Sequence, residues 1–192
     1  MANYGRFTAE TREDWRCWLE EHHASAPGVW LVTYKKDSGG PYLDYETTVE
    51  EALCFGWIDS RPNKLDDERS MRLFTPRKAG GPWSRLNKKR VARLESKGRM
   101  TDAGRRQISQ AKEDGSWTVY DSVEQLEEPE DLASALDADE VARMHFDSFP
   151  DSSKKIILWW IKSAKRTTTR EKRVRETVRL AAENVRSNHY RQ

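Results

Sequence analysis

The strand signals of this chain all precede residue 76, and every later segment has the periodicity of a helix. The run at 29–34 (VWLVTY) is β-branched and aromatic, which predicts a strand. Residues 57–65 and 71–75 predict the two strands of a hairpin, and Pro62 restricts the first of them to an edge of the sheet. Strands in one part and helices in the other indicate an α+β fold with a small, mainly antiparallel sheet.

Helix starts in the first part are marked by hydroxyl side chains, which accept hydrogen bonds from backbone N–H groups. Thr11 precedes a stripe of residues that recur every three or four positions, namely Trp15, Trp18, Leu19 and His22. Thr47 and Thr48 each precede a glutamate by three positions, as in a capping box. We therefore expect a helix to begin there, after a short strand at 42–45.

The remaining chain reads as a series of helices. Ser84 is expected to start the first of them, and Pro129 and Pro150 break an acidic segment into two or three short helices. Residues 154–164 are apolar on most of their surface, which predicts a buried helix. A last helix is expected at 169–188, with valines and an alanine on one stripe.

Composition favours a globular protein in a reducing compartment. The charged fraction is 34% and the mean hydropathy is −0.95, yet eight Trp, six Tyr and five Phe supply bulky side chains for a core. Cys17 and Cys54 are far apart and fit no ligand spacing, so we expect reduced thiols, a cytoplasmic location, no metal and no cofactor. The longest apolar run is six residues, which predicts no membrane span. The domains are expected at 1–115 (α+β) and 116–192 (helical), with separate cores or a shared one.

Charge alternates in blocks along the chain. Residues 1–68 and 113–150 are acidic, whereas 69–112 and 151–192 are basic, and the blocks nearly cancel to a net charge of +2. Either the blocks pack against one another and neutralise, or a basic face remains for an anionic partner.

The most suggestive local pattern is RKAGGPWS at 77–84, in which two cations and a glycine pair precede a helix start. Helix N-termini attract anions through their unpaired N–H groups and dipole. This pattern predicts a cleft for a small anionic or peptidic ligand, edged by residues of the hairpin and of the new helix: Trp57, Asp59, Arg61, Arg77, Lys78, Trp83, Ser84 and Asn87. The alternative is structural, with Ser84 serving only as a helix cap and Arg77 paired with an acid such as Asp59.

Two further functions stay open. Basic runs could bind nucleic-acid phosphates through residues of two helices: Lys88, Lys89, Arg90, Lys165, Arg166, Arg170 and Arg173. Aromatic residues are not interleaved with these runs, as a stacking platform for single strands requires, so a solvated helix face is the alternative. A small enzyme could use Cys54 or Asp59, but no histidine lies near them in sequence to act as a base.

Several short blocks occur in the order typical of one known family. The blocks are ALCFGWIDS (52–60), FTPRK (74–78), WSRLN (83–87), GRM (98–100), FP (149–150), WI (160–161) and AKRTTTREKRV (164–174). The chain thereby resembles the YdeI/OmpD-associated family from about Trp15 to Val185, although Thr168 stands where that family commonly has Glu. The resemblance implies a role in stress resistance or bacteriocin protection, and it supplies no catalytic residues. The sequence therefore predicts a cytosolic ligand-binding protein, with an enzyme as the less favoured reading.

Overall fold

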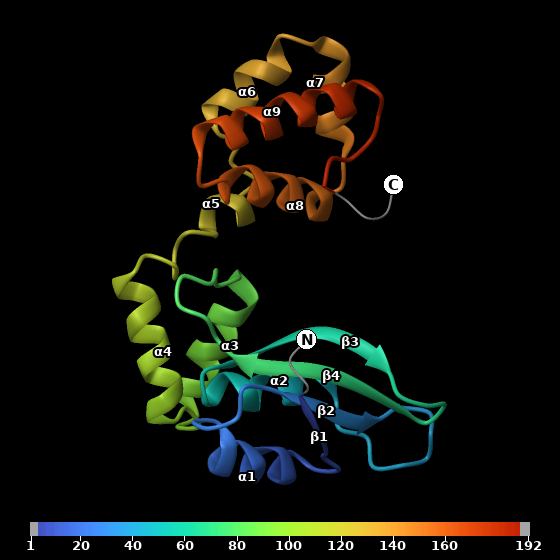
Figure 1. Ribbon diagram of the computed structural model, residues 1–192, viewed down its shortest axis with the longest axis vertical. Coiled ribbons are helices and arrows are strands. Elements are labelled where there is room, and N and C mark those ends of the chain that lie inside the picture. The colour runs from blue at the N-terminus through green and yellow to red at the C-terminus, as the bar shows by residue number, and fades with distance from the viewer. Residues whose placement is uncertain (1–3, 189–192) are drawn as a thin grey trace. The chain divides into compact units, whose positions relative to one another are not determined.

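The computed structural model describes residues 4–188, and the chain divides into two compact units (Figure 1). Unit 1 comprises residues 1–118 and unit 2 comprises residues 119–192. The elements of unit 1 are β1 (Gly5–Thr8), α1 (Arg12–His22), β2 (Val29–Tyr34), α2 (Tyr45–Cys54), β3 (Trp57–Lys64), β4 (Arg69–Pro76), α3 (Arg85–Ser96) and α4 (Asp102–Glu113). The elements of unit 2 are α5 (Asp121–Glu124), α6 (Glu130–Asp137), α7 (Glu140–Ser148), α8 (Asp151–Lys162) and α9 (Thr167–Ala182).

The four strands form one sheet in the order β1-β2-β4-β3. The β2–β4 and β3–β4 pairs are antiparallel, which confirms the predicted α+β fold with a mainly antiparallel sheet. Pro62 lies on the edge strand β3, as predicted, because proline has no N–H to donate to a neighbouring strand. The register of β3 shifts between Asp59 and Pro62. The strand β1 pairs parallel with β2 and was not predicted.

Local capping explains where the first two helices start. The Thr11 side chain accepts from Asp14 N while Asp14 accepts from the Thr11 backbone, so α1 begins as predicted. The next predicted helix is present, but it starts at Tyr45 instead of after residue 45, and the predicted strand at 42–45 is wrong because residues 42–44 form no strand. Asp44 caps this helix, since its carboxylate accepts from both the backbone N and the hydroxyl of Thr47.

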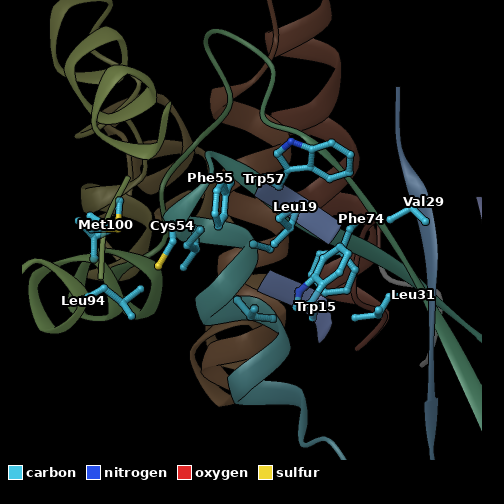
Figure 2. Close-up of a cluster of buried hydrophobic side chains, with 14 of the residues drawn as sticks. Trp15, Leu19, Val29, Leu31, Cys54, Phe55, Trp57, Phe74, Leu94 and Met100 are labelled. Carbon is cyan, nitrogen blue, oxygen red and sulfur yellow. The ribbon is translucent and has the colours of Figure 1, made fainter. Parts of the chain in front are cut away.

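Unit 1 has an aromatic core beneath the sheet (Figure 2). Trp15 is fully buried, with its ring 5.3 Å from that of Phe74, and its indole N–H donates to the carbonyl of Thr48. This hydrogen bond satisfies the polar end of the indole, so the large ring can be buried without an unpaired donor. Gly104 lets α4 approach the end of α2, because a Cβ there would lie 2.3 Å from the carbonyl oxygen of Cys54.

Unit 2 encloses its own, mostly aliphatic core. Its fully buried side chains are Leu132, Leu136, Ala142, Phe146, Ile157, Ile161 and Ala181. The helix α9 ends at Ala182, six residues before the predicted end at 188, because Asn184 takes a φ of 58° and the Val185 N–H turns back to the carbonyl of Leu180. Val185 therefore lies outside the helix on which it was expected. Within residues 4–188, no helix is long and apolar enough to cross a membrane.

Candidate functional site

A pocket of about 270 Å³ lies on the face of the unit 1 sheet next to α2. The strands β2 and β4 form its floor, because Leu31 pairs with Arg72 and Thr33 pairs with Ser70, and paired residues project from the same face. The segment between β2 and α2 closes the sides. Its further lining residues are Tyr34, Lys35, Lys36, Tyr42, Leu43, Tyr45, Thr48, Pro62, Met71 and Phe74.

Arg72 is the best-held cation of this pocket. Its guanidinium lies over the ring of Tyr45, with Cζ 4.5 Å from the ring centroid. Asp59 braces both groups, because one of its oxygens accepts from Arg72 Nη1 and from the Tyr45 hydroxyl, each at 3.1 Å. Burial, followed by the nearby Asp59 carboxylate, raises the pKa of Tyr45, so its hydroxyl remains a donor at neutral pH. The arrangement presents a fixed cation beside an aromatic ring.

The charged side chains that line the pocket are all basic. Three cations line it (Lys35, Lys36 and Arg72), and none of its described lining residues is acidic. Lys35 Nζ donates to the backbone carbonyls of Asp66 and Asp67, which holds its ammonium group in place. Lys36 is exposed and makes no ion pair within residues 4–188. Because Asp59 largely neutralises Arg72, the excess of positive charge in the pocket comes from Lys35 and Lys36.

Gly40 shapes the wall that carries Tyr34. A Cβ at this position would lie 2.3 Å from the Tyr34 ring, closer than any side chain tolerates. The loop between β2 and α2 can therefore lie directly on the ring, which fixes one side of the pocket.

The predicted cleft residues are distributed differently from the expectation. The indoles of Trp57 and Trp83 are buried, with exposures of 1% and 2%, and the Trp57 N–H donates to the carbonyl of His23. Arg77 lies on the ring of Trp83, with Cζ 3.7 Å from its centroid. Burial lowers the pKa of Arg77 to about 10, with Asp59 opposing the shift, and its buried Nε has no partner among the described residues.

The other residues of the predicted cleft have mainly local partners. Ser84 caps α3 by accepting from Asn87 N, and Asn87 in turn accepts from Arg90. Asp59 pairs with Arg72 instead of Arg77. Arg61 on β3 is exposed, and so is Lys78, which follows the end of β4. Among the eight residues, the structure thus brings together Arg77 with Trp83 and Ser84 with Asn87.

The basic residues of the nucleic-acid hypothesis are partly neutralised. Arg90 is buried and pairs with Glu46, Arg170 pairs with Asp131, and Arg173 donates to the carbonyl of Trp160. These ion pairs link acidic and basic blocks of the chain, as the neutralising interpretation predicted. Lys89, Lys165 and Arg166 are exposed, and Lys88 is half-buried.

An aromatic ring does lie close to two cations in the folded chain, although aromatic residues are not interleaved with the basic runs in the sequence. The ammonium groups of Lys88 and Lys112 are each 5.5 Å from the ring of Trp117, which contacts Trp83 at 4.9 Å. The three residues come from α3, α4 and the segment after α4, so their sequence spacing could not reveal the cluster.

A buried ion network joins α1, α2 and the end of α3. The carboxylate of Glu51 is fully buried and accepts from Arg12 at 2.5 Å, Arg16 at 2.9 Å and Arg99 at 2.8 Å. Glu50 is bound by Arg12 and by Arg93. The sequence assigned these glutamates only to a helix start. Their spacing gives no signal of the network, because the arginines come from distant segments.

Cys54 is poorly suited to nucleophilic catalysis. Its thiol is fully buried, and burial together with the nearby Glu51 carboxylate raises the pKa to about 11. A thiol with this pKa is protonated at neutral pH, whereas the thiolate is the nucleophile. No group of three or more His, Cys, Asp and Glu side chains within residues 4–188 could hold a metal ion.

Comparison with known families finds one match in each unit. Residues 7–107, more than half of the chain, match the family described as "Domain of unknown function (DUF8412)". The chain belongs to this family. Residues 125–184 match a second family, described as "Bacteriocin-protection, YdeI or OmpD-Associated", which confirms the resemblance for this segment. The blocks at 52–60, 74–78 and 83–87 fall within the DUF8412 match. No curated protein and no solved structure matches the chain.

Proposed function

We propose that the DUF8412 segment binds a small planar anion in the pocket beside α2. The observation that supports this proposal is the lining itself: two lysines, the Asp59-paired Arg72 and three tyrosines line the pocket together with apolar residues such as Leu31 and Leu43, and none of the described lining residues is acidic. Small-molecule sites combine an apolar surface with a few fixed polar groups. A ring bearing a carboxylate or a phosphate matches both features.

Each side chain has a distinct part in this binding. Arg72 offers a planar guanidinium that suits a two-oxygen acceptor, and Asp59 restricts its motion before the ligand arrives. Lys36 adds a flexible point charge at the rim. Tyr34 and Tyr45 supply ring surfaces against which a planar ligand packs.

We extend to this chain the protective role that the description of the second family names. Binding an anionic small molecule or peptide would then serve resistance to bacteriocins or another stress. The match over residues 125–184 supports this role. The cytoplasmic location stays a prediction from the sequence.

The binding test uses calorimetry with aromatic carboxylates, aryl phosphates and the neutral amides of the same rings. Arg72→Met should weaken binding of the anions by about tenfold or more, since a charged hydrogen bond is lost. Arg77→Met is the matched control, because it removes the guanidinium of the cleft predicted from the sequence and leaves the pocket intact. Equal binding of anions and amides, or a loss only in Arg77→Met, would reject the pocket. The second result would instead support the cleft at 77–84.

Nucleic-acid binding is the second candidate, because Lys88 and Lys112 flank the ring of Trp117. A base could stack on the indole while the two ammonium groups contact phosphates. Titration with single-stranded oligonucleotides at several salt concentrations tests this candidate. Binding that weakens with salt in the wild type and is lost in Trp117→Ala supports it, whereas binding with no salt dependence contradicts it.

A further inference from the structure

Unit 2 contains a pocket of its own, of about 220 Å³, near the segment between α5 and α6. This space admits a small molecule of amino-acid size. Val123 and Leu158 are buried, with exposures of 2% each, and form an apolar floor. Pro129 adds a further apolar surface.

Four charged side chains line this pocket, and two of them are already neutralised. Both carboxylate oxygens of Glu128 accept from the two terminal nitrogens of Arg143. Arg170 binds both oxygens of Asp131 through Nε and Nη2. These two lining residues therefore contribute little net charge to a ligand.

The remaining two charges are opposite in sign and do not neutralise each other. Lys162 Nζ donates to the hydroxyl of Ser122 at 2.6 Å, and it forms no ion pair within residues 4–188. Glu127 is exposed and forms no ion pair within residues 4–188. A carboxylate and an ammonium that share one pocket without pairing leave room for a ligand that pairs with both.

The backbone around Glu127 is held in an unusual conformation. Leu126 has a φ of 58°, a left-handed conformation that branched and bulky side chains rarely adopt. The Glu127 N–H donates to the carbonyl of Ser122 at 2.9 Å, which closes the turn. This conformation ends α5 in the same way as Asn184 ends α9, and it fixes the backbone that carries Glu127.

We propose that this pocket binds a zwitterion of amino-acid size with an apolar side chain. Its ammonium group pairs with Glu127, and its carboxylate accepts from Lys162 and from the Ser122 hydroxyl. The side chain of the ligand packs on Val123 and Leu158. This proposal is independent of the anion pocket in unit 1, because the two sites share no residue.

The test is calorimetry on the full chain with leucine, N-acetyl-leucine and leucinamide, which present both charges, only the carboxylate and only the ammonium. Leucine should bind at least about tenfold more tightly than either blocked compound, because each of these loses one charged hydrogen bond. Binding of an ω-amino acid of similar size then shows which separation of the ammonium and carboxylate groups fits the pocket. Equal binding of leucine and either blocked compound, or no binding of any zwitterion, would overturn the proposal.

Matched variants locate the binding in this pocket. Lys162→Met and Glu127→Gln should each weaken leucine binding about tenfold, and their thermal unfolding should stay close to that of the wild type since both side chains are exposed. The controls are Lys165→Met and Glu130→Gln, which change the same residue types at exposed positions outside the pocket. Equal weakening in the controls would show that general charge, not the pocket, governs binding.

Discussion

The two units differ in where they keep their charges. Unit 1 buries Glu51, Glu50 and Arg90, with exposures of 0%, 8% and 5%, whereas the buried polar residues described in unit 2 are uncharged serines and a threonine. Ion pairs of unit 2, such as Arg170 with Asp131, lie at the surface. A buried ion pair adds little net stability over an apolar contact of the same shape, but it specifies one arrangement of its elements. Unit 1 thus adds buried ion pairs to its aromatic core, whereas the described core of unit 2 contains no buried charge.

This difference bears on the anion pocket. Glu46 pairs with Arg90 and Arg93, which ties α2 to α3, and Glu51 ties α2 to α1. Tyr45, the first residue of α2, lines the pocket and contacts Arg72. The ion network does not line the pocket, but it positions α2 and therefore Tyr45 in the pocket wall.

The largest expected effect comes from breaking this network at its centre. Glu51→Gln leaves three arginines around a neutral amide. Because these arginines are 27–33% exposed and solvent screens them, the loss of unfolding free energy should approach, but not exceed, the value of about 3–5 kcal/mol for a fully buried pair. Chemical denaturation monitored by tryptophan fluorescence measures the loss. Glu20→Gln is the control, because Glu20 pairs with Arg16 at a half-exposed position. Similar losses in the two variants would mean that burial of the network has no special importance.

The next effect concerns the aliphatic core of unit 2. Leu136 is fully buried, so Leu136→Ala should lower the unfolding free energy of this unit by about 2–5 kcal/mol through lost transfer energy and a cavity. We expect hydrogen exchange measured by mass spectrometry to accelerate in α6 to α9, with α1 and α2 unchanged, because the two hydrophobic clusters share no residue. Equal acceleration in both units would show that they unfold together.

A smaller effect follows from the buried thiol of unit 1. The pKa of Cys54 is raised to about 11 from an ordinary 9.0, so the folded protein favours the protonated form. This contribution to stability is fully present below pH 9 and is lost as the pH rises to about 11. Two pKa units correspond to about 2–3 kcal/mol at most. Cys54→Ala should therefore lose less stability than the wild type between pH 9 and pH 11 in urea titrations, and parallel curves would contradict the shift.

Local signals predicted most of the helices. The capping box at Thr11 and the cap at Ser84 lie within a few residues of the groups they bind, so the sequence alone locates them. The start of α2 was misplaced because the Thr47 and Thr48 patterns competed with Asp44, and only the observed hydrogen bonds decide between such caps. The strand β1 was missed since its four residues are stabilised by pairing with β2, a contact distant in sequence.

The candidate sites depend even more on distant contacts. Asp59 was selected from the sequence as a neighbour of Arg77, yet the register of β3 and β4 places it beside Arg72. Likewise, Trp117 meets Lys88 and Lys112 only once α3 and α4 have packed. The charge blocks allowed either mutual pairing or a free basic face, and composition could neither decide between these alternatives nor say which arginines would be buried.

The smallest effect is expected where unit 2 pairs its charges at the surface. Arg170 is the main cause that lowers the pKa of Asp131, so the pair stabilises the fold above the ordinary aspartate pKa of 3.8 and loses this effect as the pH falls below it. Asp131→Asn should nevertheless cost less than about 1 kcal/mol at pH 7, because solvent screens a pair whose side chains are 30% and 43% exposed. Asp131→Asn and Glu51→Gln each replace a carboxylate by its amide, so comparing them under the same denaturation conditions isolates the effect of burial. A loss for Asp131→Asn as large as that for Glu51→Gln would remove the distinction between the buried ion pairs of unit 1 and the surface ion pairs of unit 2.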